Sequence, residues 1–295
     1  MTDPTIRAKN VRGIIALLCG QALFVGSDSV IKLAGDLMPA TEIMAVRGLF
    51  AVLLMGGFVA GTIGLDRWPL LLKPLVLVRA TLEAMLAFLF VLSLPHMPLP
   101  DITVIQQITP LVLTIMAAFL LREVVGWQRW LAVAIGFGGV ALVIQPTGQG
   151  VNFYAFTALL CAVFVAFRDL ITRRLHDGIP TALVTLGSTI SVCAGGFAGA
   201  PFERWQSLSA YGLSLLAVSA VLVSIANMFV VRAFRGVEVS VVSPFRYAAV
   251  VWATLLGFLI WGHVPNALAV VGTLVIVGSG LYTMHREALR PAARR

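Results

Sequence analysis

Residues 99–121 read LPDITVIQQITPLVLTIMAAFLL, an apolar run interrupted by one charged residue and a few small or polar ones. About 20 apolar residues in a helix are enough to cross a bilayer, so this run predicts a membrane-spanning helix. The whole chain of 295 residues shares this character, with 59% hydrophobic and 12% charged residues and a mean hydropathy of +0.97. Soluble domains carry about a quarter charged residues. The composition therefore excludes a soluble globule, a disordered chain, collagen and a coiled coil, and it indicates a polytopic membrane protein.

On either side of residues 99–121, apolar runs separated by Pro, Gly or charged residues predict further helices. The expected fold class is an all-α membrane protein with ten transmembrane helices. No connector is long enough to fold as a separate domain, so any chemistry must lie within the helix bundle. The predicted helices are 12–34, 39–62, 70–93, 99–121, 127–145, 152–174, 180–200, 208–232, 238–261 and 265–285.

The positive charges predict an orientation for these helices. With the N-terminus inside, the inner segments hold fifteen Lys and Arg residues and the outer segments hold two, Lys32 and Arg204. Cytoplasmic loops carry an excess of Lys and Arg, so this asymmetry favours cytoplasmic N- and C-termini. The basic N-terminus precedes an apolar run too long for a signal peptide, and we interpret that run as the first span. The expected location is the bacterial inner (plasma) membrane, with the lipid bilayer as a partner.

The excess of 21 Lys and Arg over 13 Asp and Glu does not indicate a nucleic-acid partner, because it lies in connectors and at the tail. The three cysteines, Cys19, Cys161 and Cys193, lie in apolar runs and have no disulfide or zinc spacing. All four histidines lie at helix ends or in connectors. We therefore expect no metal site and no cofactor.

The two halves of the chain resemble each other at a shift of 140–141 residues. Asp28 aligns with Asp169 at a shift of 141, and Thr103 aligns with Ser243 at a shift of 140. The first repeat is predicted to cover residues 1–148 and the second residues 149–295, within one integrated membrane domain. Because each repeat has five spans, an odd number, the second must enter the membrane inverted. Inverted repeats form a site near the midplane between the halves and are typical of carriers that work by alternating access.

The stretches PLPDITVIQQITP (98–110) and GVEVSVVSPFRY (236–247) lie at matching places in these two repeats. With this architecture, the chain resembles the drug/metabolite transporter superfamily. It is most similar to the EamA-type exporters and, within them, to the bacterial amino-acid and aromatic-amino-acid exporters. The resemblance covers the whole chain and implies that helices 1–4 and 6–9 surround a central cavity. Glu123 at the end of the fourth helix follows the family's usual pattern, but the second half departs from it with His263 at the corresponding place.

Polar residues on two spans are candidates for lining that cavity. In the fourth span they recur at steps of three and four, which places them on one helical face: Thr103, Gln106, Gln107 and Thr114. The ninth span repeats the pattern with Ser240, Ser243, Tyr247 and Thr254, and Arg246 lies beside them. Hydrogen bonding between helices is the structural alternative, since it is common in membrane bundles. Pro110 and Pro244 interrupt the same two helices and are candidate hinges, although kinks are also ordinary structural features.

Intramembrane charges are costly, so they are expected to face the bundle interior and to pair. We expect three ion pairs: Asp28 with Arg47, Asp169 with Arg246, and Arg79 with Glu83 on the same helix. Arg168 is then expected to extend to the inner headgroups.

The functional alternative gives some of these groups to the substrate. Arg47 or Arg246 could bind a substrate carboxylate through the planar guanidinium, and Glu83 is the best candidate proton carrier. Aromatic residues could accept the substrate's side chain. The remaining candidate substrate-binding residues are Phe24, Phe164, Asn227 and Trp252. Gly57/Gly61 and Gly195/Gly199 have the spacing of close helix packing, and we assign them no chemistry.

These features predict a secondary transporter that exports small metabolites, most plausibly amino acids, including aromatic and hydrophobic ones. No nucleotide-binding loop is present, so a substrate or ion gradient must supply the energy, and proton coupling is left open. Export of drugs, nucleosides, sugars or toxic compounds is the alternative. An intramembrane enzyme lacks any visible catalytic pair, and a channel lacks a filter-like loop.

Overall fold

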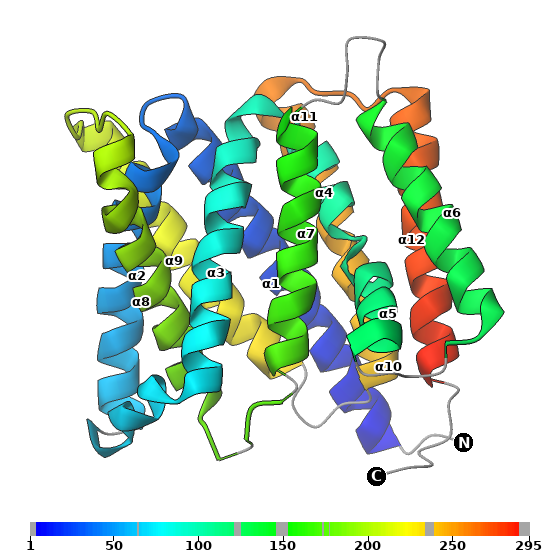
Figure 1. Cartoon of the computed structure of the whole chain (residues 1–295), viewed down its shortest axis with the longest axis horizontal. Helices are drawn as coiled ribbons and strands as arrows, with labels where there is room; N and C mark the ends of the chain where they lie inside the picture. Colours follow the sequence, from blue (N-terminus) through cyan, green and yellow to red (C-terminus); the bar gives the residue numbers. More distant parts are fainter. Residues whose placement is uncertain are drawn as a thin grey trace. The chain divides into compact units, whose positions relative to one another are not determined.

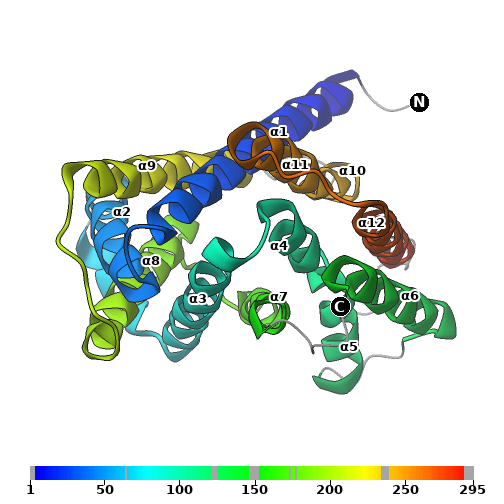
Figure 2. The ribbon, with the colours of Figure 1, turned by 90° about the horizontal axis from the view of Figure 1, so that it is seen from above.

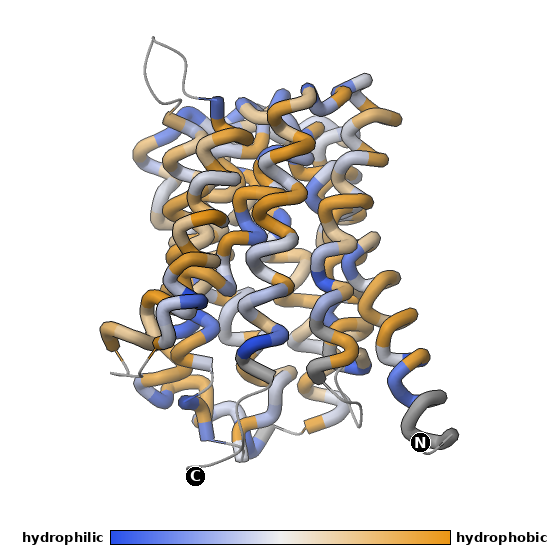
Figure 3. Tube along the Cα trace, turned by 90° about the vertical axis from the view of Figure 1, so that its right-hand side faces the viewer, coloured by the Kyte–Doolittle hydropathy of each residue, from blue (hydrophilic) through white to orange (hydrophobic). Residues whose placement is uncertain are grey.

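The chain forms ten helices that are long and apolar enough to cross a membrane, as the sequence predicts. The computed structural model describes residues 4–63, 65–120, 125–145, 153–172, 174–176, 178–233 and 239–288. Within these residues all regular structure is helical (Figure 1). Hydrophobic residues occupy most of the length of the helices (Figure 3).

The helices have the following bounds in chain order: α1 (Pro4–Gly35), α2 (Ala40–Thr62), η1 (Leu65–Leu72), α3 (Pro74–Ser93), η2 (Leu94–His96), α4 (Leu99–Gln106), α5 (Thr109–Leu120), α6 (Trp127–Ile144), α7 (Phe153–Thr172), α8 (Thr181–Gly199), η3 (Ala200–Phe202), α9 (Ala210–Ala233), α10 (Val239–Val242), η4 (Ser243–Tyr247), α11 (Ala248–Trp261) and α12 (Ala267–Ala288). Each predicted span corresponds to one of these helices or to a consecutive group of them. The fourth span is divided into α4 and α5, and the ninth into α10, η4 and α11.

The described helices form two compact units, and each unit draws on both halves of the sequence. Unit 1 comprises residues 1–25, 98–155 and 225–295, and unit 2 comprises residues 26–97 and 156–224. In unit 1, α6 packs along α12 and α4 packs against α11; in unit 2, α8 packs against α2 and α3. Figure 2 shows both α2 beside α8 and α6 beside α12.

Close contact between α2 and α8 depends on glycines in both helices. A Cβ atom added to Gly48 would lie 2.8 Å from Cα of Cys193, and one added to Gly196 would lie 2.8 Å from Cα of Ala45. One added to Gly199 would lie 2.5 Å from Cγ2 of Thr41. Along this interface, positions advance in α2 while they recede in α8. The two helices are therefore antiparallel.

The glycine spacing in the sequence identifies only part of this packing. Gly199 lies at the interface, but Gly57 and Gly61 would meet no atom within 4 Å if they carried a Cβ. In unit 1, Gly139 of α6 and Gly272 of α12 bring the two backbones together: a Cβ on Gly139 would lie 2.9 Å from the Gly272 carbonyl oxygen. Glycines serve close packing in both units, but mostly at positions outside the predicted pairs.

A substitution at the α2–α8 interface tests this packing. We expect Gly196→Ala to lower the free energy of unfolding by about 1–3 kcal/mol, the usual cost of overpacking, because its methyl group would collide with the α2 backbone. The control is Gly57→Ala, which places the same methyl group in open space and should leave stability equal or higher. Thermal unfolding of the purified protein in detergent measures both. Equal melting temperatures for the two variants would contradict the close approach of the helices.

Candidate functional site

Four charged side chains form a cluster between α3 and α7 in unit 2, which we call the α3–α7 charge cluster (Arg79, Glu83, Arg168 and Asp169). Nη1 of Arg168 lies 3.3 Å from each carboxylate oxygen of Glu83. Nη2 of Arg168 lies 2.7 Å from Oδ1 of Asp169. Nη2 of Arg79 lies 3.8 Å from Oε2 of Glu83. With two guanidinium and two carboxylate groups, the cluster is electrically neutral, which lowers the cost of placing it inside a membrane.

Arg79 extends this cluster to a third helix. Its Nε donates to Oγ1 of Thr172 on α7 at 2.9 Å, and its Nη1 donates to Oγ of Ser188 on α8. The cluster and its two hydroxyl partners therefore join α3, α7 and α8 within the apolar part of unit 2.

The partners of Arg168 differ from the expectation that this residue reaches the headgroups. Its guanidinium lies between two carboxylates, those of Glu83 and Asp169, and pairs with both. The expected contact between Arg79 and Glu83 is present, one helical turn apart on α3. Asp169 forms its ion pair with Arg168. Arg246 belongs to unit 1, so its pairing with Asp169 stays a prediction.

Among the described residues, Arg47 on α2 makes one hydrogen bond and has a buried Nε without a partner. Its Nη2 donates to Oγ of Ser27 at 3.3 Å, and Ser27 in turn is 2.8 Å from Oγ of Ser219. Its Nε is buried and has no hydrogen-bond partner in the part of the chain that the structure describes. A guanidinium group has five N–H donors arranged for carboxylate recognition. The side chain therefore has donors available for an anionic group.

Asp28, the expected partner of Arg47, interacts with it electrostatically. In the described part of unit 2, no hydrogen bond or ion pair joins them directly. Ser27 and Asp28 are successive residues of α1, and the hydrogen bond of Arg47 to this pair goes to the Ser27 hydroxyl. One negative and one positive group thus lie near each other without neutralising each other by contact.

Lys32, near the predicted outer end of the first span, is buried within α1. Its Nζ donates at 2.7 Å to the carbonyl oxygens of both Leu94 and Met97, at the end of α3 and η2. Glu42, at the start of α2, is also buried and accepts a hydrogen bond from the backbone N–H of Gln206 at 2.8 Å. Both partners are backbone groups distant in sequence, so no residue pattern could have predicted them.

In unit 1, the break between α4 and α5 lies at Gln107 and Ile108. Pro110 has no N–H to donate to the Gln106 carbonyl, and Thr109 Oγ1 donates to that oxygen instead at 2.7 Å. The half-buried side chain of Gln107 has no hydrogen-bond partner in the part of the chain that the structure describes. The break thus presents an amide without an internal partner.

The threonines of this helix face inward but bond locally. Thr103 Oγ1 donates to the Leu99 carbonyl at 2.8 Å, and Thr114 Oγ1 donates to the Pro110 carbonyl at 3.0 Å. These bonds within one helix satisfy both hydroxyl protons, and each oxygen can still accept a hydrogen bond from a ligand.

The ninth span is also broken, and η4 includes Pro244. Tyr247 at the end of η4 is buried, and its ring packs where Gly280 of α12 has no side chain. Arg246 is exposed. The side chain of Ser243 lies outside the described residues, as does Glu123. At the predicted shift of 140 residues, Gln107 aligns with Tyr247, so the two broken helices have their breaks at corresponding positions.

The other predicted site residues divide between the two units. Phe24, Asn227 and Trp252 in unit 1 are half-buried. Phe164 in unit 2 packs against an apolar cluster of α3 and α7 that includes Leu86, Cys161 and Val165. Its position between these helices favours a packing role over contact with substrate. Among the described residues, no group of three or more His, Cys, Asp or Glu could hold a metal ion.

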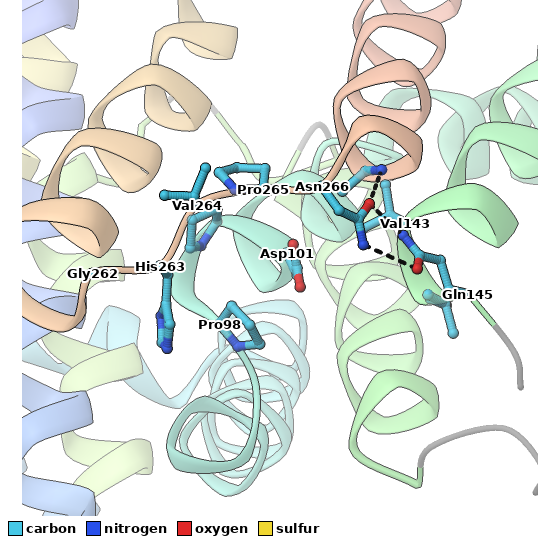
Figure 4. A pocket seen from close by; sticks show the side chains of 12 residues that line it. Pro98, Asp101, Val143, Gln145, Gly262, His263, Val264, Pro265 and Asn266 are labelled. Atoms are coloured by element: carbon cyan, nitrogen blue, oxygen red, sulfur yellow. Dashed lines mark hydrogen bonds between the residues drawn. The ribbon is translucent and has the colours of Figure 1, made fainter.

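A cavity of about 540 Å³ lies at one end of unit 1 (Figure 4). It lies where α4 and α12 begin and where α6 and α11 end. Its polar lining side chains are those of Asp101, Gln145, His263 and Asn266. None of these four residues is among the candidate site residues predicted from the sequence. Asp101, an acidic residue near the start of the fourth span, is the one feature of the sequence that could have pointed to this cavity.

Comparison with known proteins places the chain among membrane transporters. The EamA-like transporter family matches residues 11–145 and again residues 152–284. An S-adenosylmethionine uptake transporter of Rickettsia prowazekii (strain Madrid E) is 25% identical to this chain. The matched region covers 64% of this chain and 64% of that relative. The pseudopaline exporter of Pseudomonas aeruginosa (strain UCBPP-PA14) is 26% identical to this chain. The matched region covers 90% of this chain and 93% of the exporter.

Two further matches cover almost the full length. A riboflavin transporter of Vibrio cholerae serotype O1 is 25% identical over 99% of both chains. A solved crystal structure has a TM-score of 0.61 at 19% identity, over 97% of this chain and 99% of that one. At this identity the structural match shows the fold alone.

The charge cluster generates a prediction for Arg168. Arg168→Gln leaves two carboxylates in unit 2 with fewer partners, and we expect it to lower the free energy of unfolding by roughly 3 kcal/mol, as when one partner of a buried pair is removed. The exposed Arg204→Gln removes the same charge and should leave stability unchanged. Thermal unfolding in detergent measures both. Adding Glu83→Gln to Arg168→Gln should recover part of the loss, and a double variant less stable than the single one would contradict the pairing.

Proposed function

The chain belongs to the EamA-like transporter family, and from this premise we propose that it is a secondary transporter that exports small metabolites by alternating access. Its ten apolar helices make it a multi-pass membrane protein. The proposal is carried by the family match to each half of the chain in turn, with relatives that are all named as transporters. We propose transport and not catalysis as its activity.

The inverted repeat that alternating access requires is supported by the packing within the units. At a shift of about 140 residues, α2 corresponds to α8 and α6 corresponds to α12. These corresponding helices pack against each other. The α2–α8 contacts are antiparallel, as the inversion of one repeat demands.

We propose amino acids, including aromatic and hydrophobic ones, as the substrates. The observation that favours them is the arrangement of Asp28 and Arg47 in unit 2. Arg47 has unused donors for a carboxylate, and Asp28 lies near it without contacting it directly. An α-amino acid carries one carboxylate and one ammonium group on the same carbon. It would complement the guanidinium with the first and the Asp28 carboxylate with the second.

The named relatives favour a second candidate, a transporter of larger metabolites. They are named for S-adenosylmethionine, pseudopaline and riboflavin, and for both uptake and export. A site that also takes an adenosyl or flavin ring would need a wider aromatic-accepting surface.

Proton coupling through Glu83 is also proposed. Protonation of Glu83 would weaken its attraction to Arg168 and Arg79, and so loosen the junction of α3 with α7. Such a change would link proton binding to helix packing.

Flux measurements in liposomes test the substrate and its coupling. Liposomes that contain the purified protein should release labelled aromatic amino acids much faster than protein-free liposomes do. An imposed pH gradient should change this release rate. The panel includes S-adenosylmethionine and riboflavin. We expect Arg47→Gln to lower amino-acid flux at least tenfold, since one charge-assisted hydrogen-bonded contact contributes about 1.5–3 kcal/mol. Arg204→Gln is the matched control.

The outcomes separate the parts of the proposal. Flux of riboflavin or S-adenosylmethionine without amino-acid flux would replace the substrate class but retain the transporter. Flux that does not respond to the pH gradient would remove proton coupling. No flux of any panel member in liposomes that contain folded protein would contradict metabolite transport of this range.

We also propose that the N- and C-termini face the cytoplasm of a bacterial inner membrane. In a variant lacking Cys19, Cys161 and Cys193, single cysteines at the exposed positions Arg12, Arg204 and Arg286 report the orientation. A membrane-impermeant maleimide should label Arg204→Cys from outside intact spheroplasts. It should label Arg12→Cys and Arg286→Cys only after permeabilisation. Labelling of positions 12 and 286 from opposite sides would contradict an even number of spans.

A further inference from the structure

The cavity at the end of unit 1 has no part in the transport proposal, which rests on Asp28 and Arg47 of unit 2. Its volume of about 540 Å³ lies within the range of small-molecule sites. It is lined by residues of α4, α6 and α12 and by the connector 262–266. All of these belong to unit 1, so the cavity is formed within one compact part of the chain.

Asp101 supplies the one carboxylate among the described lining residues. It lies between the 262–266 connector and the side chains of Gln145 and Asn266 (Figure 4). In the described part of the chain its carboxylate has neither a hydrogen bond nor an ion pair. A partly buried carboxylate without a partner is costly, and a cation bound beside it would offset that cost.

The opposite wall of the cavity is a fixed pair of amides. Nε2 of Gln145 donates to Oδ1 of Asn266 at 2.7 Å, and Nδ2 of Asn266 donates to Oε1 of Gln145 at 3.1 Å. Asn266 Oδ1 also accepts the backbone N–H of Ala269, which caps α12. Gln145 adopts a left-handed conformation with φ of 47°. These bonds fix the amides in place, and Gln145 Oε1 retains one lone pair for a donor in the cavity.

Helix ends of both polarities meet at the cavity, since α4 and α12 begin there and α6 and α11 end there. The carbonyl ends of α6 and α11 lie there, at Ile144 and Trp261, and carry the partial negative charge of the helix dipole. At the amino end of α12, the side chain of Asn266 accepts one backbone N–H, that of Ala269. No Lys or Arg occurs among the described lining residues. The described lining therefore has one carboxylate, that of Asp101, and no Lys or Arg to neutralise it.

We propose that this cavity is a binding site for small organic cations that carry a primary ammonium group, with Asp101 as the counterion. An ammonium group has three N–H donors. One would bond to the Asp101 carboxylate, and the others would face the Gln145 amide oxygen and the carbonyl groups at the ends of α6 and α11. The apolar side chains of Val143, Ile144 and Val264 would contact the carbon skeleton of the ligand.

Equilibrium binding to the purified full-length protein in detergent tests the site. The probe is 2-phenylethylamine, compared with neutral 2-phenylethanol and anionic phenylacetate, which share its ring. We expect the amine to bind and to raise the melting temperature, and we expect the alcohol and the acid to bind at least tenfold more weakly. Equal binding of amine and alcohol to the wild-type protein would overturn the proposal without any variant.

Variants then locate the binding. Asp101→Asn removes the charge at nearly constant shape and should weaken amine binding at least tenfold, while Asp101→Glu should retain it within a few-fold. The control is Asp66→Asn, the same change at an exposed position of unit 2, which should leave binding unchanged. Amine binding that is unaffected by Asp101→Asn would overturn the assignment to this cavity. If Asp101→Asn does not fold, Asp101→Glu and the ligand comparison decide the question.

This test is independent of transport. A protein that moves no amino acid in liposomes can still bind 2-phenylethylamine at Asp101. A protein that transports amino acids can show amine binding that Asp101→Asn leaves unchanged. Failure of one proposal therefore does not entail failure of the other.

Discussion

A charge inside a bilayer has no bulk water around it, so the protein itself must provide the groups that stabilise it. Unit 2 meets this constraint in two ways. The α3–α7 charge cluster matches two arginines to two acids, and Lys32 donates to backbone carbonyls at the end of α3 and η2. Arg47 meets the constraint incompletely, because among the described residues its buried Nε has no hydrogen-bond partner. At the end of unit 1, the Asp101 carboxylate likewise has no hydrogen bond or ion pair to a described residue. Where a costly group is left without an internal partner, a bound ligand can supply one.

The sequence predicts the helices well, because membrane-spanning segments are determined by a local property. Each needs about 20 apolar residues, and Pro, Gly or charge marks its ends. The predicted 39–62 and 99–121 segments agree within two residues with Ala40–Thr62 and Leu99–Leu120. The breaks in the fourth and ninth spans are also local. Pro110 removes one donor, and the helix is interrupted within the preceding turn.

Partners of side chains are not a local property, and here the sequence is less informative. The Arg79–Glu83 contact follows from a spacing of four residues, but Arg168 and Glu83 are 85 residues apart. Lys32 bonds to carbonyl oxygens, which every residue possesses and which no residue type identifies. The glycines in close packing show the same limit: Gly57 and Gly48 lie on one helix, and only the facing helix makes Gly48 the one in contact. Prediction from residue types alone therefore finds the charged groups but not their pairing.

The direction in which corresponding helices pack bears on whether the two repeats are inverted, which composition alone does not reveal. If the two halves of the chain had the same orientation, corresponding helices would run parallel wherever they packed together. The contacts of Thr41 with Gly199 and of Gly48 with Cys193 run in opposite senses along α2 and α8. The contacts of Gly139 with Gly272 and of Gln145 with Asn266 do the same along α6 and α12. Two independent helix pairs, one in each unit, are therefore antiparallel. An inverted repeat accounts for both, whereas a repeat without inversion accounts for neither.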